Sequence, residues 1–287
     1  MKKIGVIGAR GFIGSHLVRH FSALGFEVTS FSHAPENSNL GSNDYMDISL
    51  MTKRFQKIDV LINAAWIGLE QANRDNWGVQ SRNVEINKSL LAAVTKATVN
   101  HYICLGSQDE FGLSITPWGD DDSLSPQSSY AKAKCEVLGC VEGSELPTTW
   151  ARIFSTYGIG DLRNSVFLKV LRALKYQTPL ELGGCEQMWT NLHISDLSRG
   201  IEKIISESIF GRVNVADDYS KLLRDQLEMM IQISGKENLI TFNDNGAKYR
   251  NIESKSGKLK KTGWLPKVTY EEGFAELLEW SMQDSHV

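Results

Sequence analysis

Tyr130 and Lys134 are the pair in this 287-residue chain whose types and spacing could move a proton. They stand four residues apart in SPQSSYAKAK, shortly after Pro126, where a helix can begin. That spacing puts both side chains on one face of a helix. A phenol keeps its proton up to a pH of about 10, and a nearby ammonium lowers that value. The pair is therefore a candidate proton donor, although many surface helices carry the same spacing.

A glycine-rich turn near the N-terminus could hold a dinucleotide. A strand predicted over Lys2–Ile7 runs into GARGFIGSHLVRHFSALG, in which Gly8, Gly11 and Gly14 precede an amphipathic helix that ends at Gly25. Such a turn lets the backbone come close to a pyrophosphate, and the helix N-terminus offers N–H donors. The spacing is GxxGxxG, where many dehydrogenases have GxGxxG.

The end of the second predicted strand, Glu27–Phe31, bears on which dinucleotide binds. NAD-binding proteins place an acid there to hold the ribose 2′-hydroxyl, but this chain has Ser32 and His33. An acid would repel a 2′-phosphate, whereas Arg10 in the turn and His33 could attract one. We therefore expect NADP(H), with NAD(H) as the alternative.

The order of the remaining elements predicts the fold. They are a strand over Lys57–Ala65, a helix over Val79–Ala97, a strand over Asn100–Leu105, a helix over Ser129–Cys140 and a strand over Thr148–Phe154. Strands that alternate with helices predict an α/β protein with a Rossmann-type, doubly wound parallel sheet. Ligands bind beyond the carboxyl ends of such strands, where Ser107 could hydrogen-bond a reacting oxygen or simply cap a loop.

Composition excludes other classes of protein. The net charge of −3 provides no basic field for nucleic acid, and no apolar run is long enough to cross a bilayer. The four cysteines have no CxxC spacing, so we expect reduced packing residues and no metal site. We expect a cytoplasmic protein with neither a membrane nor a nucleic-acid partner.

The three glycines, Ser107 and the Tyr130–Lys134 pair, in this order, resemble the extended short-chain dehydrogenase/reductases. This is the family of sugar-nucleotide epimerases, dehydratases and reductases. Further matching pieces are DVLINAA (59–65), ARIFSTYG (151–158), HISD (193–196), RVNVADD (212–218) and GWLP (263–266). The resemblance implies a dinucleotide-binding domain over residues 1–160, with a returning segment near 190–218. A smaller α/β substrate domain over 161–287 would be interleaved with it.

The resemblance also implies roles for individual residues. Tyr130 would be the acid/base, Lys134 would hold the nicotinamide ribose and lower the pKa of the tyrosine, and Ser107 would polarise the reacting oxygen. The cofactor would contact Gly8, Arg10, Gly11, Phe12, Ile13, Gly14, His33, Asp47, Ile48, Ala64, Ala65 and Asn83, besides Tyr130 and Lys134. Asp47 and Ile48 are expected on a loop, near the adenine.

Departures from the family pattern indicate the reaction. Dehydratases of the family follow their Ser/Thr with an Asp–Glu pair, but here Gln108 precedes Asp109, which disfavours 4,6-dehydration. The GARG turn is similar to that of the NADPH-using, fucose-synthesising members. We therefore expect an NADPH-dependent reductase of a nucleotide-linked 4-keto-6-deoxyhexose. The alternatives are an NAD(P)-dependent epimerase and a non-catalytic, dinucleotide-binding member.

Trp189 is the second departure, because many members have an arginine there that grips the nucleotide pyrophosphate. Arg163 or Arg172 could provide that contact instead, while Trp189 could stack on a base or sugar or fill the core. The substrate-binding candidates are Gln108, Asp109, Asn164, Phe167, Arg172 and Trp189. We also expect a homodimer, because relatives pair the helices that match Val79–Ala97 and Ser129–Cys140.

Overall fold

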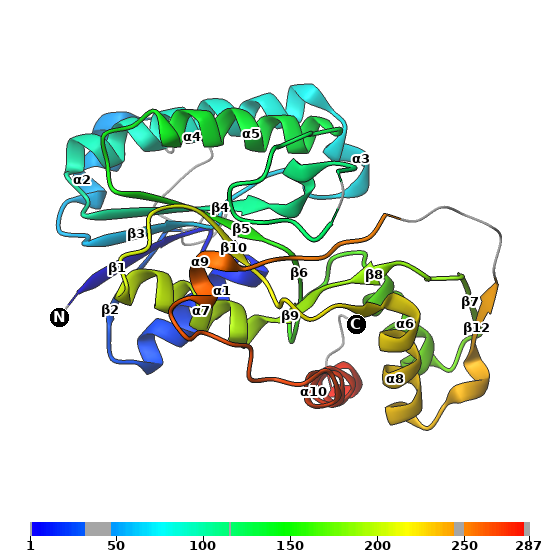
Figure 1. Cartoon of the computed structure of the whole chain (residues 1–287). Coiled ribbons are helices and arrows are strands. Elements are labelled where there is room, and N and C mark those ends of the chain that lie inside the picture. Colours follow the sequence, from blue (N-terminus) through cyan, green and yellow to red (C-terminus); the bar gives the residue numbers. More distant parts are fainter. Residues whose placement is uncertain (1, 32–46, 115, 244–249, 284–287) are drawn as a thin grey trace.

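The computed structural model describes residues 2–31, 47–114, 116–243 and 250–283. At its centre is a six-stranded sheet in the order β10-β5-β4-β3-β1-β2 (Figure 1). These strands are β1 (Lys3–Ile7), β2 (Glu27–Phe31), β3 (Val60–Asn63), β4 (His101–Ser107), β5 (Thr148–Ile153) and β10 (Gly211–Val215). Every neighbouring pair runs parallel, which confirms the predicted Rossmann-type α/β fold.

Helices cover both faces of this sheet (Figure 1). One face carries α1 (Phe12–Ala23) and α7 (Ile194–Ser206), and the other carries α2 (Ile48–Phe55), α4 (Trp77–Ala97) and α5 (Ser129–Glu142). Every residue of β3 and β4 is buried. A strand covered on both faces needs a continuous apolar run instead of alternation, which is why VLIN and HYICLGS read as strands.

The C-terminal part of the chain forms a second hydrophobic core. It lies among α6 (Val166–Tyr176), α8 (Leu223–Ser234) and α10 (Tyr270–Gln283), and stacked aromatic rings such as Phe167 and Phe274 fill it. A parallel pair of strands, β7 (Leu180–Gly183) and β12 (Ile240–Asn243), closes its outer side (Figure 1).

The remaining short elements lie between these larger ones. They are α3 (Gln71–Arg74), β6 (Ser155–Tyr157) paired with β9 (Asn191–His193), β8 (Met188–Trp189) paired with β11 (Lys221–Leu222), α9 (Gly257–Lys260), and two 3-10 turns at Gln108–Phe111 and Glu237–Leu239. Between α6 and α8 the chain returns to the sheet as β10, beside β5. The division into domains over 1–160 and 161–287 stays a prediction. In the described part of the chain, no helix is long and apolar enough to cross a membrane.

Candidate active site

The glycine turn between β1 and α1 is packed too tightly for side chains. Gly8 has a φ of +78°, and a Cβ there would lie 2.8 Å from the backbone nitrogen of Ala65. A Cβ on Gly14 would lie 2.1 Å from the carbonyl oxygen of Gly8. Gly11 caps α1 and has no side chain to bond its first N–H groups. The turn therefore fits a pyrophosphate, which a bare backbone and a helix N-terminus bind well.

Several predicted cofactor residues surround this turn. Ala64 and Ala65 follow β3 and abut Gly8, Phe12 and Ile13 are half-buried in the first turn of α1, and Arg10 is exposed. His33 lies outside the described residues. Their contacts with a dinucleotide stay predictions.

Asp47 and Ile48 are in a different local structure from the predicted loop. Asp47 is the N-cap of α2, and its Oδ1 accepts a hydrogen bond of 2.9 Å from the backbone nitrogen of Leu50. Ile48 is the first helical residue and packs against the core beneath α2. An aspartate is a strong N-cap, which explains why a helix begins there.

The side-chain amide of Asn83 hydrogen-bonds backbone groups beside the predicted cofactor site. Its Oδ1 accepts from the backbone nitrogen of Ile67 at 2.9 Å, and its Nδ2 donates to the carbonyl oxygen of Ile67 at 3.0 Å. Asn83 therefore positions the loop that follows Ala64 and Ala65. A direct contact of its amide with the cofactor would have to compete with these bonds.

Ser107, Tyr130 and Lys134 meet at the carboxyl end of β4, and all three are buried. Ser107 ends β4, whereas Tyr130 and Lys134 lie on the inner face of α5, which begins after the N-cap Ser128. Ser107 provides a hydrogen bond that lowers the pKa of Tyr130. The Nζ of Lys134 donates to the carbonyl oxygen of Leu105 at 2.7 Å. The structure thus brings the three predicted residues together.

The pKa values of the pair differ from the expectation. Burial raises the pKa of Tyr130 to about 12, against the lowering effects of Ser107 and Arg74. Burial lowers the pKa of Lys134 to about 7, although the Glu110 carboxylate raises it. Desolvation disfavours the charged form of each group, and this outweighs the lowering that a neighbouring ammonium was expected to cause.

Two arginines that were not predicted as site residues, Arg74 and Arg250, converge on the predicted substrate residues Gln108 and Asp109. Arg74 forms an ion pair with Oδ2 of Asp109, and Arg250 lies 3.3 Å from its Oδ1. Arg250 also donates to Oε1 of Gln108 at 2.5 Å and to the carbonyl oxygen of Gly112 at 2.7 Å. Both carboxylate oxygens of Asp109 therefore interact with an arginine.

A buried ion pair supports the loop that carries Ser107. Oε1 of Glu110 accepts from the backbone nitrogen of Ser107 at 2.6 Å, and Oε2 accepts from Nε of Arg152 at 2.9 Å. Both side chains are fully buried. Arg152 further donates to Oδ1 of Asn214 at 2.9 Å, which links the loop to β10. This pair fixes the backbone on which Ser107 stands.

The candidates for the substrate phosphate occupy different environments. Arg172 is exposed on α6, but both Nε and Nη2 of Arg163 are held by Asp161, at 2.7 and 2.8 Å. Arg163 therefore has less freedom to bind a phosphate than expected. Asn164 is exposed in the segment between β6 and α6.

The two aromatic candidates lie deeper than expected. Phe167 packs against Tyr157 and Phe274 in the second core, and a substrate contact for it stays a prediction. Its apolar neighbours on α6 and α10 explain its burial. Trp189 is half-buried in β8 and touches two hydrophobic clusters, so its predicted stacking on a base or sugar stays open.

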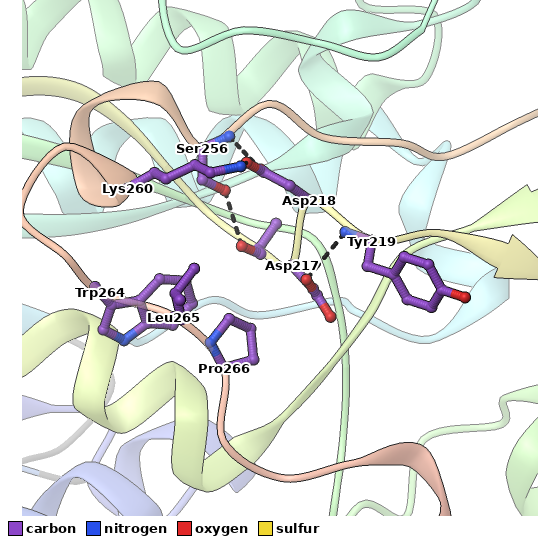
Figure 2. Close-up of a pocket in the computed structure, with 9 residues that line it drawn as sticks. Asp217, Asp218, Tyr219, Ser256, Lys260, Trp264, Leu265 and Pro266 are labelled. Atoms are coloured by element: carbon purple, nitrogen blue, oxygen red, sulfur yellow. Dashed lines mark hydrogen bonds and ion pairs between the residues drawn. The ribbon is translucent and has the colours of Figure 1, made fainter.

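A separate cavity of about 300 Å³ lies where the RVNVADD and GWLP pieces meet (Figure 2). None of the site residues predicted from the sequence lines it. Asp218 accepts from the backbone nitrogen of Ser256 at 2.6 Å and pairs with Nζ of Lys260 at 3.0 Å, while Asp217 accepts from the backbone nitrogen of Tyr219 (Figure 2). These bonds hold the loop after β10 against α9.

Comparison with known proteins identifies the family. The model of the NAD dependent epimerase/dehydratase family matches residues 4–216. The chain belongs to this family. The match confirms the predicted resemblance and the predicted class of enzyme, an NAD(P)-dependent oxidoreductase of the short-chain dehydrogenase/reductase type.

Relatives of this family member have diverged widely. Human dTDP-D-glucose 4,6-dehydratase is 22% identical and aligns over 99% of this chain and 91% of its own. The dTDP-6-deoxy-L-talose 4-dehydrogenase (NAD(+)) of Aggregatibacter actinomycetemcomitans is 25% identical over 79% of this chain and 88% of its own. The structure of RMD from Pseudomonas aeruginosa with NADPH has a TM-score of 0.86 at 18% identity, covering 99% of each chain. The relatives thus include more than one reaction and use both nicotinamide cofactors.

Proposed function

We propose that this family member is an NADPH-dependent reductase of a nucleotide-linked 4-keto-6-deoxyhexose. The observation that carries the proposal is the state of Asp109, whose two oxygens face Arg74 and Arg250. The position before it holds Gln108, an amide that neither gives nor takes a proton. Elimination of water needs an acid and a base on the turn after β4. Asp109 is poorly placed to be either, because its carboxylate is paired with two arginines. Ketone reduction needs neither.

The state of Tyr130 supports proton donation. A reductase must give a proton to the ketone oxygen, so its acid must be protonated at neutral pH. Burial raises the pKa of Tyr130 to about 12, so the phenol carries its proton there. An epimerase would first have to use the same residue as a phenolate base, which this environment disfavours.

The roles of the chain's own groups follow from this geometry. Bound NADPH would supply the hydride. Ser107 and Tyr130 would hydrogen-bond the ketone oxygen, and the phenolic proton of Tyr130 would move to it. The buried Glu110 would keep Ser107 in place through its backbone nitrogen. The product would be an activated deoxysugar.

The preference for NADPH over NADH rests on Arg10. Arg10 is exposed within the glycine turn, and a guanidinium there would bind a 2′-phosphate well. The names of the relatives include both cofactors, so the choice is a proposal about this chain alone.

Two other functions are tested by the same experiment. The first is an NAD(P)-dependent sugar-nucleotide epimerase, which the membership of the family allows. The second is a non-catalytic, dinucleotide-binding member, which the presence of Ser107, Tyr130 and Lys134 disfavours.

The test mixes the protein with NADPH or NADH and a panel of CDP-, dTDP-, GDP- and UDP-linked 4-keto-6-deoxyhexoses. Absorbance of the reduced nicotinamide should fall with at least one of them, faster with NADPH, and Tyr130→Phe should slow that loss at least about 100-fold. Unchanged absorbance with every 4-ketosugar, together with interconversion of a nucleotide-linked hexose and its C4 epimer in the presence of NAD⁺ or NADP⁺, would favour the epimerase. Binding of dinucleotide without any turnover would favour the non-catalytic member.

A further inference from the structure

Two cations lie near the ring of Tyr130, and the nearer one is not the lysine of the YxxxK pair. The Cζ of Arg74 lies 4.1 Å from the centroid of the Tyr130 ring, whereas the Nζ of Lys134 lies 5.8 Å from it. Lys134 faces elsewhere, because its Nζ bonds the carbonyl oxygen of Leu105 and lies 3.6 Å from the centroid of the Trp66 ring.

The position of Arg74 is fixed by its neighbours. Its Nη2 pairs with Oδ2 of Asp109, and Arg250 braces Oδ1 of the same carboxylate at 3.3 Å. The side chains of these three residues are only 22–30% exposed. Burial of this extent limits the screening of their charges by solvent.

Other charged groups also act on Tyr130. Apart from Arg74, these are Asp109 and Glu110 on the turn after β4, which raise its pKa, and Arg163 after β6, whose own pKa is raised by Tyr130. Arg163 is paired with Asp161, and Glu110 with Arg152. Among the groups that face the ring, Arg74 is the cation in direct contact with its face.

We propose that Arg74 is a positioning residue for proton transfer, whose guanidinium, held by Asp109, stabilises the phenolate of Tyr130. When the O–H bond of Tyr130 breaks and the proton bonds to the substrate oxygen, the negative charge stays on the phenol. A planar cation over the ring face attracts that charge. This inference rests on the proposed role of Tyr130 as the proton donor, but not on the identity of the substrate.

The test measures the ionisation of Tyr130 directly. Every tyrosine is replaced by fluorotyrosine, whose phenol is more acidic than that of tyrosine. The ¹⁹F NMR signal of residue 130 is identified as the one that Tyr130→Phe removes. Its chemical shift is then followed against pH to give the pKa. Arg74→Met should raise the pKa of Tyr130 by about one unit, a tenfold loss of phenolate at a given pH. Lys134→Met should shift it less. The control Lys132→Met removes an exposed charge of the same helix and should leave it unchanged.

A second set of variants separates a direct effect of Arg74 on the pKa of Tyr130 from an indirect one, in which Arg74 only neutralises the charge of Asp109. In an Asp109→Asn background, Arg74→Met should still raise the pKa of Tyr130. The proposal is wrong if Arg74→Met has no effect in that background, or if Lys134→Met shifts the pKa more. Arg74→Lys, which keeps the charge but not the planar group, should give an intermediate value and covers the case in which Arg74→Met does not fold. No substrate is needed, so failure of the reductase assay would leave this measurement interpretable.

Discussion

The Nζ of Lys134 lies 3.6 Å from the centroid of the Trp66 ring, so an indole covers the ammonium that the family resemblance assigns to the cofactor. Burial in this setting lowers the pKa of Lys134 to about 7. The lysine thus releases its proton at a lower pH than an exposed lysine does. It is a weaker source of positive charge for Tyr130 than an exposed lysine would be.

This burial predicts how stability depends on pH. The pKa of Lys134 is about 7 when folded, against 10.5 for an ordinary lysine, so between these pH values the unfolded chain holds a proton that the folded protein has released. The free energy of unfolding should therefore rise with pH in that window, by at most about 1.4 kcal/mol per pH unit. Urea denaturation from pH 7 to 10 should show this rise in the wild type and in Lys132→Met, but not in Lys134→Met. Parallel curves for wild type and Lys134→Met would contradict a lowered pKa of Lys134 in the folded protein.

The Glu110–Arg152 pair predicts a large loss of stability. Glu110→Gln should lower the free energy of unfolding by about 3–5 kcal/mol, because it leaves the Arg152 charge buried and unpaired. The matched control is Glu142→Gln, whose partner Arg212 lies at the surface, with a bond of 2.6 Å between Nε and Oε1. That change should cost at most about 1 kcal/mol. Equal costs in chemical denaturation would show that the buried pair matters no more than the surface one.

The glycine turn predicts a specific loss of cofactor binding. Gly14→Ala should weaken dinucleotide binding at least about tenfold, because the added methyl would force the carbonyl of Gly8 to move. Gly139→Ala is the control, since its Cβ would meet nothing within 4 Å on α5. It should leave binding unchanged and stabilise the helix by up to about 1 kcal/mol. The readout is a fluorescence titration with NADPH, and retention of full affinity by Gly14→Ala would show that the turn does not bind the pyrophosphate.

The predicted homodimer has a test of its own on the same helix. Light scattering at micromolar concentration should give twice the chain mass of 32.1 kDa. Open space surrounds Gly139 in one chain, so Gly139→Arg should leave the stability of the chain unchanged. If the predicted pairing of α4 and α5 forms, the added side chain should obstruct it and give a monomer. A monomeric wild type would contradict the predicted dimer.

The fold and the clustering of Ser107, Tyr130 and Lys134 were predictable because their signals are local. An apolar run such as VLIN indicates a buried parallel strand, and the spacing from Tyr130 to Lys134 fixes their shared helix face. The pKa values were not predictable, because they depend on how Trp66 and the core exclude water around α5. Trp66 follows Ala64 and Ala65, two predicted cofactor residues, and this sequence signal could have drawn attention to it.

Arg74 and Arg250 were not predicted as site residues, for different reasons. Arg74 lies shortly after β3, at the edge of the sheet where ligands bind, so its position could have made it a candidate. Arg250 is 138 residues from Gly112 and 142 from Gln108 along the chain, and no local pattern predicts such contacts. The burial of Phe167 was not predictable either, because an apolar residue beside a predicted cleft can equally face a core.

Net reduction of a ketone with a proton from Tyr130 can be followed directly with NADPH that carries deuterium at the transferable position. The labelled cofactor is incubated with the 4-keto-6-deoxyhexose nucleotides, and the products are analysed by NMR and mass spectrometry. We expect one deuterium at C4 of the sugar for each NADPH consumed, and we expect Tyr130→Phe to lose both the deuterium transfer and the NADPH consumption. A product that carries no deuterium from NADPH, formed while the cofactor remains reduced, would contradict net reduction.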